Sequence, residues 1–266
     1  MKVFICADIE GTAGINHWDE TIHGKADWAE FRVLMTNEVL AACEGARAAG
    51  ATEIVIKDAH DSGRNILVER LPEDARIVRN WSGHPDSMMF GLDDSFDAAI
   101  YTGYHSKAGE EGNPLAHTSN DKISRLILNG EVISEFTYNA LCAGLYGVPS
   151  VFMAGDEGIC ADARAMLPGI TTVETMRGFG PASNSISPAR SCRLIREGVE
   201  TALKGEFRKL VPATDGPWEV VVEFNNPITA YSVSWYPGAK LHGKRAVSFG
   251  HQDYFEILRA LKFIKS

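Results

Sequence analysis

Two acidic side chains follow an apolar segment near the start of the chain. Val3 to Ala7 is a continuous apolar run, and Asp8 and Glu10 come directly after it, before Gly11. Residues i and i+2 of a strand point to the same side, about 6.6 Å apart along the chain, so both carboxylates can reach one point beyond the strand. Two carboxylates buried at one point are costly unless a cation lies between them. The pattern therefore predicts half of a metal site.

Two further apolar segments end in histidine. The segment 53–60 carries Asp58 and His60 at its end, and the segment 97–105 ends in His105. The carboxyl ends of neighbouring parallel strands share one edge of a sheet, where α/β proteins bind ligands. We therefore expect His60 and His105 at the same edge as the two carboxylates. Asp58 is an alternative ligand to His60, and His105 could instead be a core histidine bonded to a carbonyl group.

Glu135 completes the candidate ligand set. Ser134 is a plausible N-cap, which places Glu135 in the first turn of a helix near the sheet edge. On its own, Glu135 is explained better by its favourable interaction with the helix dipole. Three carboxylates and two imidazoles suit two divalent cations with one carboxylate bridging them. Mixed nitrogen and oxygen ligands favour zinc, with manganese or cobalt as alternatives, over magnesium.

The elements that must position these residues alternate between apolar runs and helical patterns. The predicted strands are 3–7, 53–60, 76–79, 97–105, 150–156 and 170–176, and the predicted helices are 27–49, 134–145, 159–167 and 188–203. This alternation predicts an α/β fold with a central, mostly parallel sheet and helices on both faces. Residues 178–187 are predicted to be a loop. Strands 219–224 and 246–250 and a helix from Asp253 predict a smaller C-terminal α+β lobe, so we divide the chain into 1–204, the catalytic domain, and 205–266.

Several local signals refine this outline. Asp27 and Glu30 have the spacing of a capping box, and Gly50 is expected to end the helix that they begin. Asn129 and Gly130 predict a two-residue type I′ hairpin turn. Asp156 is expected to cap a helix rather than to bind a metal. Four tryptophans lie among apolar neighbours and are expected to pack rather than to stack on substrate: Trp28, Trp81, Trp218 and Trp235.

Composition limits the partners and the compartment. The chain has 266 residues and a net charge of −9, which makes nucleic acid and an anionic membrane unlikely partners. No apolar run reaches the roughly 20 residues of a membrane span, and the N-terminus lacks a signal peptide, so we expect a cytoplasmic protein. The five cysteines form no C-x-x-C pair, and we expect them to be reduced core thiols.

The order of these motifs resembles the D-aminopeptidase family associated with bacterial dipeptide-transport operons. The matching features span about residues 1–160. They are Asp8-x-Glu10-Gly11, Asp58-x-His60, Gly103-Tyr-His105, the loop that contains His117, Gly130 followed by Glu135, Asn139, Gly144 and the run Val151-Phe-Met-Ala-Gly-Asp156. None of these motifs is specific alone, and the resemblance rests on the whole set.

The resemblance implies a role for each site residue. Asp8 would bridge two zinc ions, with Glu10 and His60 completing one site and His105 and Glu135 the other. His117, which in isolation would be an ordinary solvated loop histidine, would be the catalytic side chain facing the metals. The family's members are ring-shaped homo-oligomers whose active sites open onto an internal chamber. They remove N-terminal D-amino acids such as D-alanine from short peptides.

The function expected from the sequence is therefore metal-assisted hydrolysis of the first peptide bond. One alternative is a dinuclear hydrolase of another bond, such as a phosphoester or a cyclic amide. Phosphoester chemistry recruits basic groups, and Lys57, Lys107 and Lys122 are predicted near the sheet edge. The other alternative is a non-catalytic protein whose metals are structural. The chain has no G-x-S-x-G elbow, no Walker A motif and no complete G-x-G-x-x-G motif.

Overall fold

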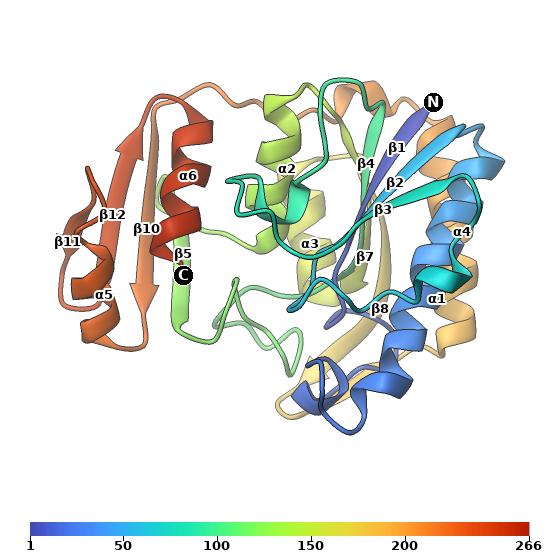
Figure 1. The fold of residues 1–266 in the computed structure, drawn as a ribbon, viewed down its shortest axis with the longest axis horizontal. Helices are drawn as coiled ribbons and strands as arrows, with labels where there is room; N and C mark the ends of the chain where they lie inside the picture. The colour runs from blue at the N-terminus through green and yellow to red at the C-terminus, as the bar shows by residue number, and fades with distance from the viewer. Residues whose placement is uncertain (266) are drawn as a thin grey trace.

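The computed structural model describes residues 1–265 and contains two sheets with helices between and around them (Figure 1). The larger sheet has the order β3-β2-β1-β4-β7-β8-β9 and the smaller one the order β11-β12-β10-β5-β6. The strands of the larger sheet are β1 (Lys2–Ala7), β2 (Glu53–Asp58), β3 (Ala75–Val78), β4 (Ala98–Tyr104), β7 (Ser150–Asp156), β8 (Thr171–Phe179) and β9 (Ala182–Ser185). The predicted α/β class with a mostly parallel sheet is confirmed.

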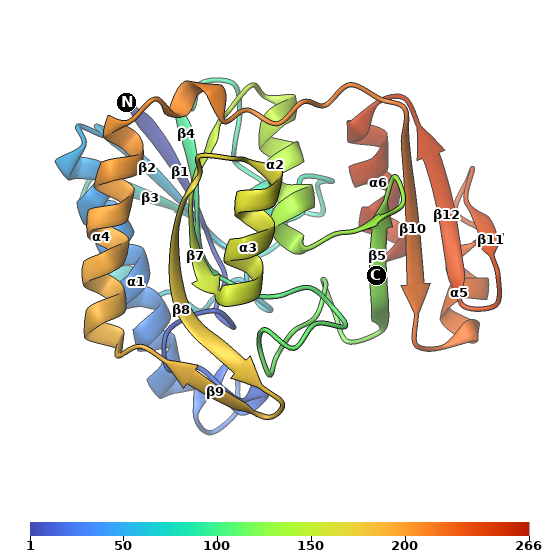
Figure 2. The same ribbon diagram turned by 180° about the vertical axis from the view of Figure 1, so that it is seen from behind.

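Helices cover both faces of the larger sheet. They are α1 (Trp28–Ala48) and α4 (Pro188–Lys204) on one face, and α2 (Glu135–Leu145) and α3 (Glu157–Met166) on the other. Figure 2 shows the α1–α4 pair on one side of the sheet and α2 and α3 on the opposite side. Because the central strands are covered on both faces, their side chains are apolar throughout, and Val3, Phe4 and Ile5 are fully buried.

The second sheet is antiparallel and carries the remaining helices. Its strands are β5 (Ile123–Leu128), β6 (Glu131–Val132), β10 (Trp218–Phe224), β11 (Lys240–His242) and β12 (Ala246–His251), accompanied by α5 (Pro227–Val233) and α6 (Tyr254–Ile264). Helix α6 packs against β10 and β12 and also against α2, so it lies between the second sheet and the larger one (Figure 1). Strands β5 and β6 also belong to this sheet, although they precede residue 205. The division at residues 204 and 205 stays a prediction.

Two local predictions were wrong. Residues 178–187 are not a loop, because the end of β8 pairs with β9 in an antiparallel hairpin, with Met176 opposite Ser185. Asp27 stands at the N-cap of α1 but its side chain makes no capping hydrogen bond. A capping box occurs earlier instead, where His17 and Glu20 cap the short 3₁₀ helix Trp18–Glu20.

Other local predictions are confirmed. Asn129 and Gly130 have φ values of 49° and 90°, as a type I′ turn requires, and Gly50 has a φ of 93° just after α1. The side chain of Ser134 caps α2 and that of Asp156 caps α3. Four of the five cysteines are buried and all five are free; Cys192 is only partly buried.

The tryptophans divide into two groups. Trp28 is buried and donates a hydrogen bond to Asn65, and Trp218 packs against Tyr254. The prediction of a packing role was wrong for Trp81 and Trp235, whose side chains are 37% and 74% exposed. Among residues 1–265, no helix has both the length and the apolar character to cross a membrane.

Candidate metal centre

The candidate site lies at the carboxyl ends of β1, β2 and β4. β1 is flanked by these two parallel strands, with Ala7 level with Asp58 on one side and with Thr102 on the other. The strand order reverses direction between β1 and β4, which is the place where open α/β sheets bind ligands. The residues that follow the three strands are therefore brought together, as the sequence predicts.

Two glycines allow the chain to cross closely at this point. The Gly11 amide donates a hydrogen bond of 2.8 Å to the Gly103 carbonyl oxygen. A side-chain Cβ on Gly11 would overlap the carbonyl oxygen of Tyr104, and one on Gly103 would overlap that of Asp8. Glycine at both positions is thus a steric requirement, because it lets Glu10 approach His105.

Asp8, Glu10 and His60 form the first group of possible ligands. The His60 Nδ1 atom lies 3.2 Å from Asp8 Oδ1 and 3.2 Å from Glu10 Oε2. The His60 Nε2 atom lies 3.0 Å from the Thr21 carbonyl oxygen, which fixes the orientation of the ring. All three side chains are buried.

Asp8, His105 and Glu135 form the second group. The His105 Nε2 atom lies 3.6 Å from Asp8 Oδ2 and 3.7 Å from Glu135 Oε1. The His105 Nδ1 atom lies 3.0 Å from the Ser106 carbonyl oxygen. The two carboxylate oxygens of Asp8 thus face different histidines, one in each group. The two groups have the membership that the sequence and the family resemblance suggest.

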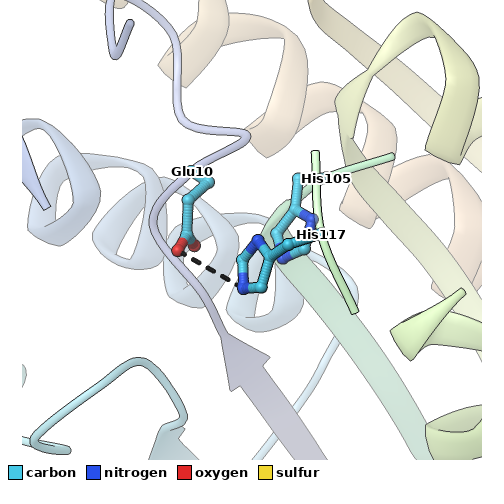
Figure 3. A group of neighbouring side chains, drawn as sticks. All are labelled: Glu10, His105 and His117. Carbon is cyan, nitrogen blue, oxygen red and sulfur yellow. Dashed lines mark ion pairs between the residues drawn. The ribbon is translucent and has the colours of Figure 1, made fainter. Parts of the chain in front are cut away.

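His117 lies beside both groups, as Figure 3 shows for Glu10 and His105. Its ring stacks on that of His105 with centroids 4.1 Å apart. Its Nε2 atom is 3.9 Å from Glu10 Oε1 and 3.8 Å from Glu135 Oε1, while Nδ1 lies 2.9 Å from the Leu115 carbonyl oxygen. The edge of Trp18 packs against the His117 ring. Glu10, His105 and His117 are close enough to form a third, overlapping group of possible ligands.

Asp58 is excluded from the cluster by its hydrogen bonds. Its carboxylate accepts hydrogen bonds from the backbone amides of Asn65 and Ile66 and from the Asn65 side chain. The same Asn65 side chain donates to the His60 carbonyl oxygen. Asp58 therefore fixes the turn that carries His60, and His60 is the residue whose side chain enters the cluster.

Asp156 fixes the residues next to His105 in a similar way. It accepts hydrogen bonds from the backbone amide and hydroxyl of Ser106 and from the Ile159 amide. Because Ser106 follows His105, the cap of α3 also fixes the end of β4.

The charges in the cluster are strongly coupled. Burial and the neighbouring Glu10 carboxylate raise the pKa of Asp8 to about 8. Burial alone would raise the pKa of Glu10 and lower that of His60, but their mutual attraction reverses both shifts. For His105, Glu10 and Glu135 outweigh burial and raise the pKa to about 9. The raised pKa values of Asp8, His60 and His105 show that the clustered carboxylates favour positive charge between them.

The donor atoms also fit metal ions. The Glu10 Oε2 and His105 Nε2 atoms are buried and make no hydrogen bond of good geometry among the described residues, although the His60 Nδ1 atom lies 3.2 Å from Glu10 Oε2. An unsatisfied buried acceptor is costly, and coordination to a cation would satisfy both atoms. Carboxylate oxygens and imidazole nitrogens at this spacing form a donor set that suits zinc.

A cavity of about 660 Å³ opens beside the cluster. Its walls come from both halves of the fold, because residues of the β1, β2 and α2 ends face residues of α6. Asp8, Glu10, His60, His117 and Glu135 contribute to its lining. The three lysines predicted near the sheet edge do not contribute to the described lining. Lys57 is buried and donates to the carbonyl oxygens of Asp58 and Asn80, and Lys107 pairs with Asp162 and Glu110.

Sequence reasoning missed several residues of this cavity. Trp18, Trp81 and Lys265 line it, and Ser119 connects it to Glu135 through a hydrogen bond of 2.6 Å from its amide to Glu135 Oε1. Trp18, in the polar segment after β1, and Trp81, just after β3, had positions in the chain that could have suggested a place near the site. Lys265 follows the last helix, α6, whose packing against α2 no local pattern predicts.

The fold and the site together define an α/β protein with a buried carboxylate–histidine centre at the switch point of its sheet. This is the architecture of a metal-dependent hydrolase with an open substrate cavity.

Comparison with known proteins identifies the family. A sequence model of the D-aminopeptidase family matches residues 1–263, and the chain belongs to this family. The chain is 30% identical to a D-aminopeptidase of Bacillus subtilis (strain 168) over 264 residues, covering 98% of this chain and 95% of the relative. A solved structure described as the Zn-dependent D-aminopeptidase DppA from Bacillus subtilis, a self-compartmentalizing protease, is similar with a TM-score of 0.93. That match is 28% identical and covers 100% of this chain and 97% of the other. The resemblance drawn from the motifs is confirmed.

Proposed function

We propose that this chain is a zinc-dependent aminopeptidase that removes N-terminal D-amino acids such as D-alanine from short peptides or amides. Family membership supports the reaction class. The observation that carries the proposal is the convergence of Asp8, Glu10, His60, His105 and Glu135 into two buried groups that share one carboxylate. Manganese or cobalt could replace zinc with the same donor set.

The proposed ligand assignment follows the two groups. Asp8 would bridge two zinc ions, Glu10 and His60 would complete one site, and His105 and Glu135 would complete the other. The buried Glu10 Oε2 and His105 Nε2 atoms, neither of which makes a well-formed hydrogen bond among the described residues, support one ligand in each site. Zinc ions, when bound, polarise a peptide carbonyl group and lower the pKa of a water molecule, so that the water can attack at neutral pH.

His117 is the proposed proton carrier. The Leu115 carbonyl oxygen accepts a hydrogen bond from Nδ1–H, so Nε2 is the atom left free to accept a proton. Burial and the neighbouring His105 lower the pKa of His117, which keeps the ring neutral and able to act as a base. Nε2 faces Glu10 and Glu135, and from there it can take a proton and pass it to the leaving amine.

The acidic lining favours substrates with a free amino group. Besides the cluster, Asp61, Asp86 and Asp121 line the cavity. An N-terminal ammonium group would be attracted into this cavity, whereas a blocked N-terminus would not be. This supports removal of the first residue of a peptide rather than cleavage within the peptide.

One experiment tests the proposed function. The purified protein is analysed for bound metals and assayed on matched D-alanyl and L-alanyl dipeptides, before and after dialysis against a chelator. We expect two zinc ions per chain, preference for the D-alanyl substrate and loss of activity with the metals. A sample that binds no transition metal when supplied, or that hydrolyses neither dipeptide when loaded, would refute the proposal.

The role of His117 has its own test. His117→Ala should lower kcat about a hundredfold while the zinc content stays at the wild-type value, by the usual size of acid–base effects. His251→Ala, at an exposed position, is the matched control. Loss of zinc from His117→Ala would instead show that His117 is a ligand, a role that its distance to Glu10 allows.

A homo-oligomer is the proposed assembly, and a ring shape fits the self-compartmentalizing relative. Helix α5 and the turn that follows it expose an apolar face of three large side chains: Ile228, Tyr231 and Trp235, which are 72%, 57% and 74% exposed. The rings of Tyr231 and Trp235 contact each other, with centroids 6.1 Å apart. We propose that a second copy of the chain covers this face. Light scattering should show a smaller particle for Trp235→Asp than for wild type, and an unchanged particle for Glu206→Lys, a charge change at an exposed position. The assembly would act on cytoplasmic peptides.

A further inference from the structure

Lys265 is placed to contact the far end of a bound peptide. Among the described residues that line the cavity, Lys262 and Lys265 at the end of α6 are the two with ammonium side chains. The remaining charged lining groups are carboxylates and histidines. The cavity therefore has a strongly acidic end at the metal cluster and a basic corner where α6 ends.

The position of Lys265 is fixed at both its backbone and its side chain. Its carbonyl oxygen accepts a hydrogen bond of 2.8 Å from the Asn120 side chain, and its Nζ atom donates to Ser119 Oγ, also at 2.8 Å. The ammonium group lies 4.2 Å from the centre of the Tyr138 ring. A lysine at a helix C-terminus usually interacts with the last carbonyl groups of its own helix. Here the side chain extends instead to Ser119, whose backbone amide donates a hydrogen bond to Glu135.

The charge of Lys265 lacks a carboxylate partner. Among the described residues, no carboxylate oxygen lies within 4.0 Å of its Nζ atom, and the side chain is half-buried in the cavity wall. Burial accordingly lowers the pKa of Lys265 to about 8. Glu135 attracts this charge from beyond contact distance but does not offset the effect of burial. A half-buried ammonium group with no carboxylate in direct contact is costly, so a carboxylate brought by a ligand would stabilise it.

The distance from the metal cluster matches one amino-acid residue. The Ser119 amide donates to Glu135 Oε1 at 2.6 Å, and Ser119 Oγ accepts from Lys265 Nζ at 2.8 Å. Glu135 Oε1 and Lys265 Nζ therefore lie within about 9 Å of each other. A dipeptide with its scissile carbonyl at the cluster carries its terminal carboxylate roughly 4 Å further on. An ammonium–carboxylate hydrogen bond adds about 3 Å. A dipeptide therefore spans the gap.

We propose that Lys265 binds the C-terminal carboxylate of a dipeptide substrate and so selects dipeptides over longer or amidated peptides. This inference rests on the proposed function and specifies its substrate class. The cavity would recognise both ends of the substrate, with acidic groups and metals around the amino end and the lysine at the carboxyl end. A carboxylate would otherwise be repelled by the acidic lining.

The test compares a free-acid dipeptide with its C-terminal amide. Wild type and Lys265→Met are assayed on D-alanyl-D-alanine and on D-alanyl-D-alaninamide. In the variant we expect KM for the free acid to rise about 10- to 100-fold, the range of a charge-assisted hydrogen bond, with kcat within threefold. The amide should be hydrolysed as well as by wild type. Lys265→Arg keeps the charge and should retain most of the preference for the free acid.

Three outcomes would overturn the assignment. Equal losses on the acid and the amide would indicate a structural or catalytic role, and no change on either would indicate none. A shift in Lys262→Met but not in Lys265→Met would assign the carboxylate to the other lysine.

A binding measurement separates this inference from the proposed function. Calorimetry with a D-alanyl-D-alanine analogue, in which a methylene group replaces the scissile carbonyl, reports binding without turnover. Weaker binding to Lys265→Met than to wild type, with the amidated analogue unaffected, supports the carboxylate site even if no dipeptide is hydrolysed. Equal binding of the analogue to both proteins would refute it even if hydrolysis is observed.

Discussion

Glu38 is a buried acid that should make the stability of this protein depend on pH. It lies in α1 beneath α4, where its Oε1 atom accepts hydrogen bonds from the Ala13 amide at 3.0 Å and from Ser191 Oγ at 2.7 Å. Its Oε2 atom is buried without a hydrogen-bond partner among the described residues. Burial, which outweighs these two hydrogen bonds, raises the pKa of Glu38 to about 7.

The sign and size of the effect follow from this pKa. An ordinary glutamate pKa is 4.5, so the folded protein holds the proton more tightly than the unfolded chain does. The contribution of Glu38 to stability is therefore greatest below pH 4.5 and is lost as the pH rises through about 7. Each pKa unit corresponds to about 1.4 kcal/mol, which makes the full loss about 3 kcal/mol. Glu38→Gln keeps an acceptor for Ala13 and Ser191 and cannot ionise, so it avoids this loss.

The assay is urea unfolding of wild type and Glu38→Gln at several pH values, at matched protein and zinc concentrations. The free energy of unfolding of the variant, relative to wild type, should rise by about 2–3 kcal/mol between pH 5 and pH 8. Taking the difference cancels the titration of the metal cluster, which both proteins share. Glu44→Gln, an exposed position on the same helix, should show no such rise. A constant difference between wild type and Glu38→Gln over this range would refute the reasoning.

Two further predictions concern the metal cluster. Asp8→Asn weakens the ligand shared by both groups and should lower the zinc content below one ion per chain, whereas Glu135→Gln should retain about one. Elemental analysis measures the zinc content of each variant. Equal zinc contents in the two variants would argue against a bridging Asp8. Gly11→Ala forces a methyl group against the Tyr104 carbonyl and should lower the free energy of unfolding by about 3 kcal/mol. Gly205→Ala, where a Cβ meets only ordinary contacts, should change it by less than about 1 kcal/mol, and similar urea midpoints for the two variants would contradict the steric argument.

The convergence of the candidate ligands could be predicted because strand geometry and sheet topology act together. Asp8 and Glu10 follow one strand with i, i+2 spacing, and parallel strands that neighbour each other end at one edge. That rule needs no knowledge of side-chain packing. Strand geometry could not decide between Asp58 and His60 as the candidate ligand, because the two residues are related as i and i+2 and point to the same side. The choice was decided by Asn65 and Ile66, whose amides occupy the Asp58 carboxylate.

Long-range pairing explains the predictions that were wrong or incomplete. The segment 182–185 is polar and short, and it becomes a strand only because the end of β8 supplies its hydrogen-bonding partner. The hairpin of β5 and β6 could be recognised from Asn129 and Gly130, but its membership in the second sheet depends on β10, which lies about 90 residues later. Neither pairing is encoded in a local pattern.

The candidate metal ligands were easier to predict than the residues proposed to select the substrate, because the two sets of residues are positioned by different sheets. Every proposed ligand follows a strand of the larger sheet or begins α2, so each stands in a short motif with its own spacing. The wall opposite is formed by α6, which the second sheet places against α2. Lys265 therefore reaches Ser119 across 146 positions of the chain. If this arrangement determines substrate length, changes at the end of α6 should alter which peptides are accepted without altering metal content, while changes after β1 should alter both.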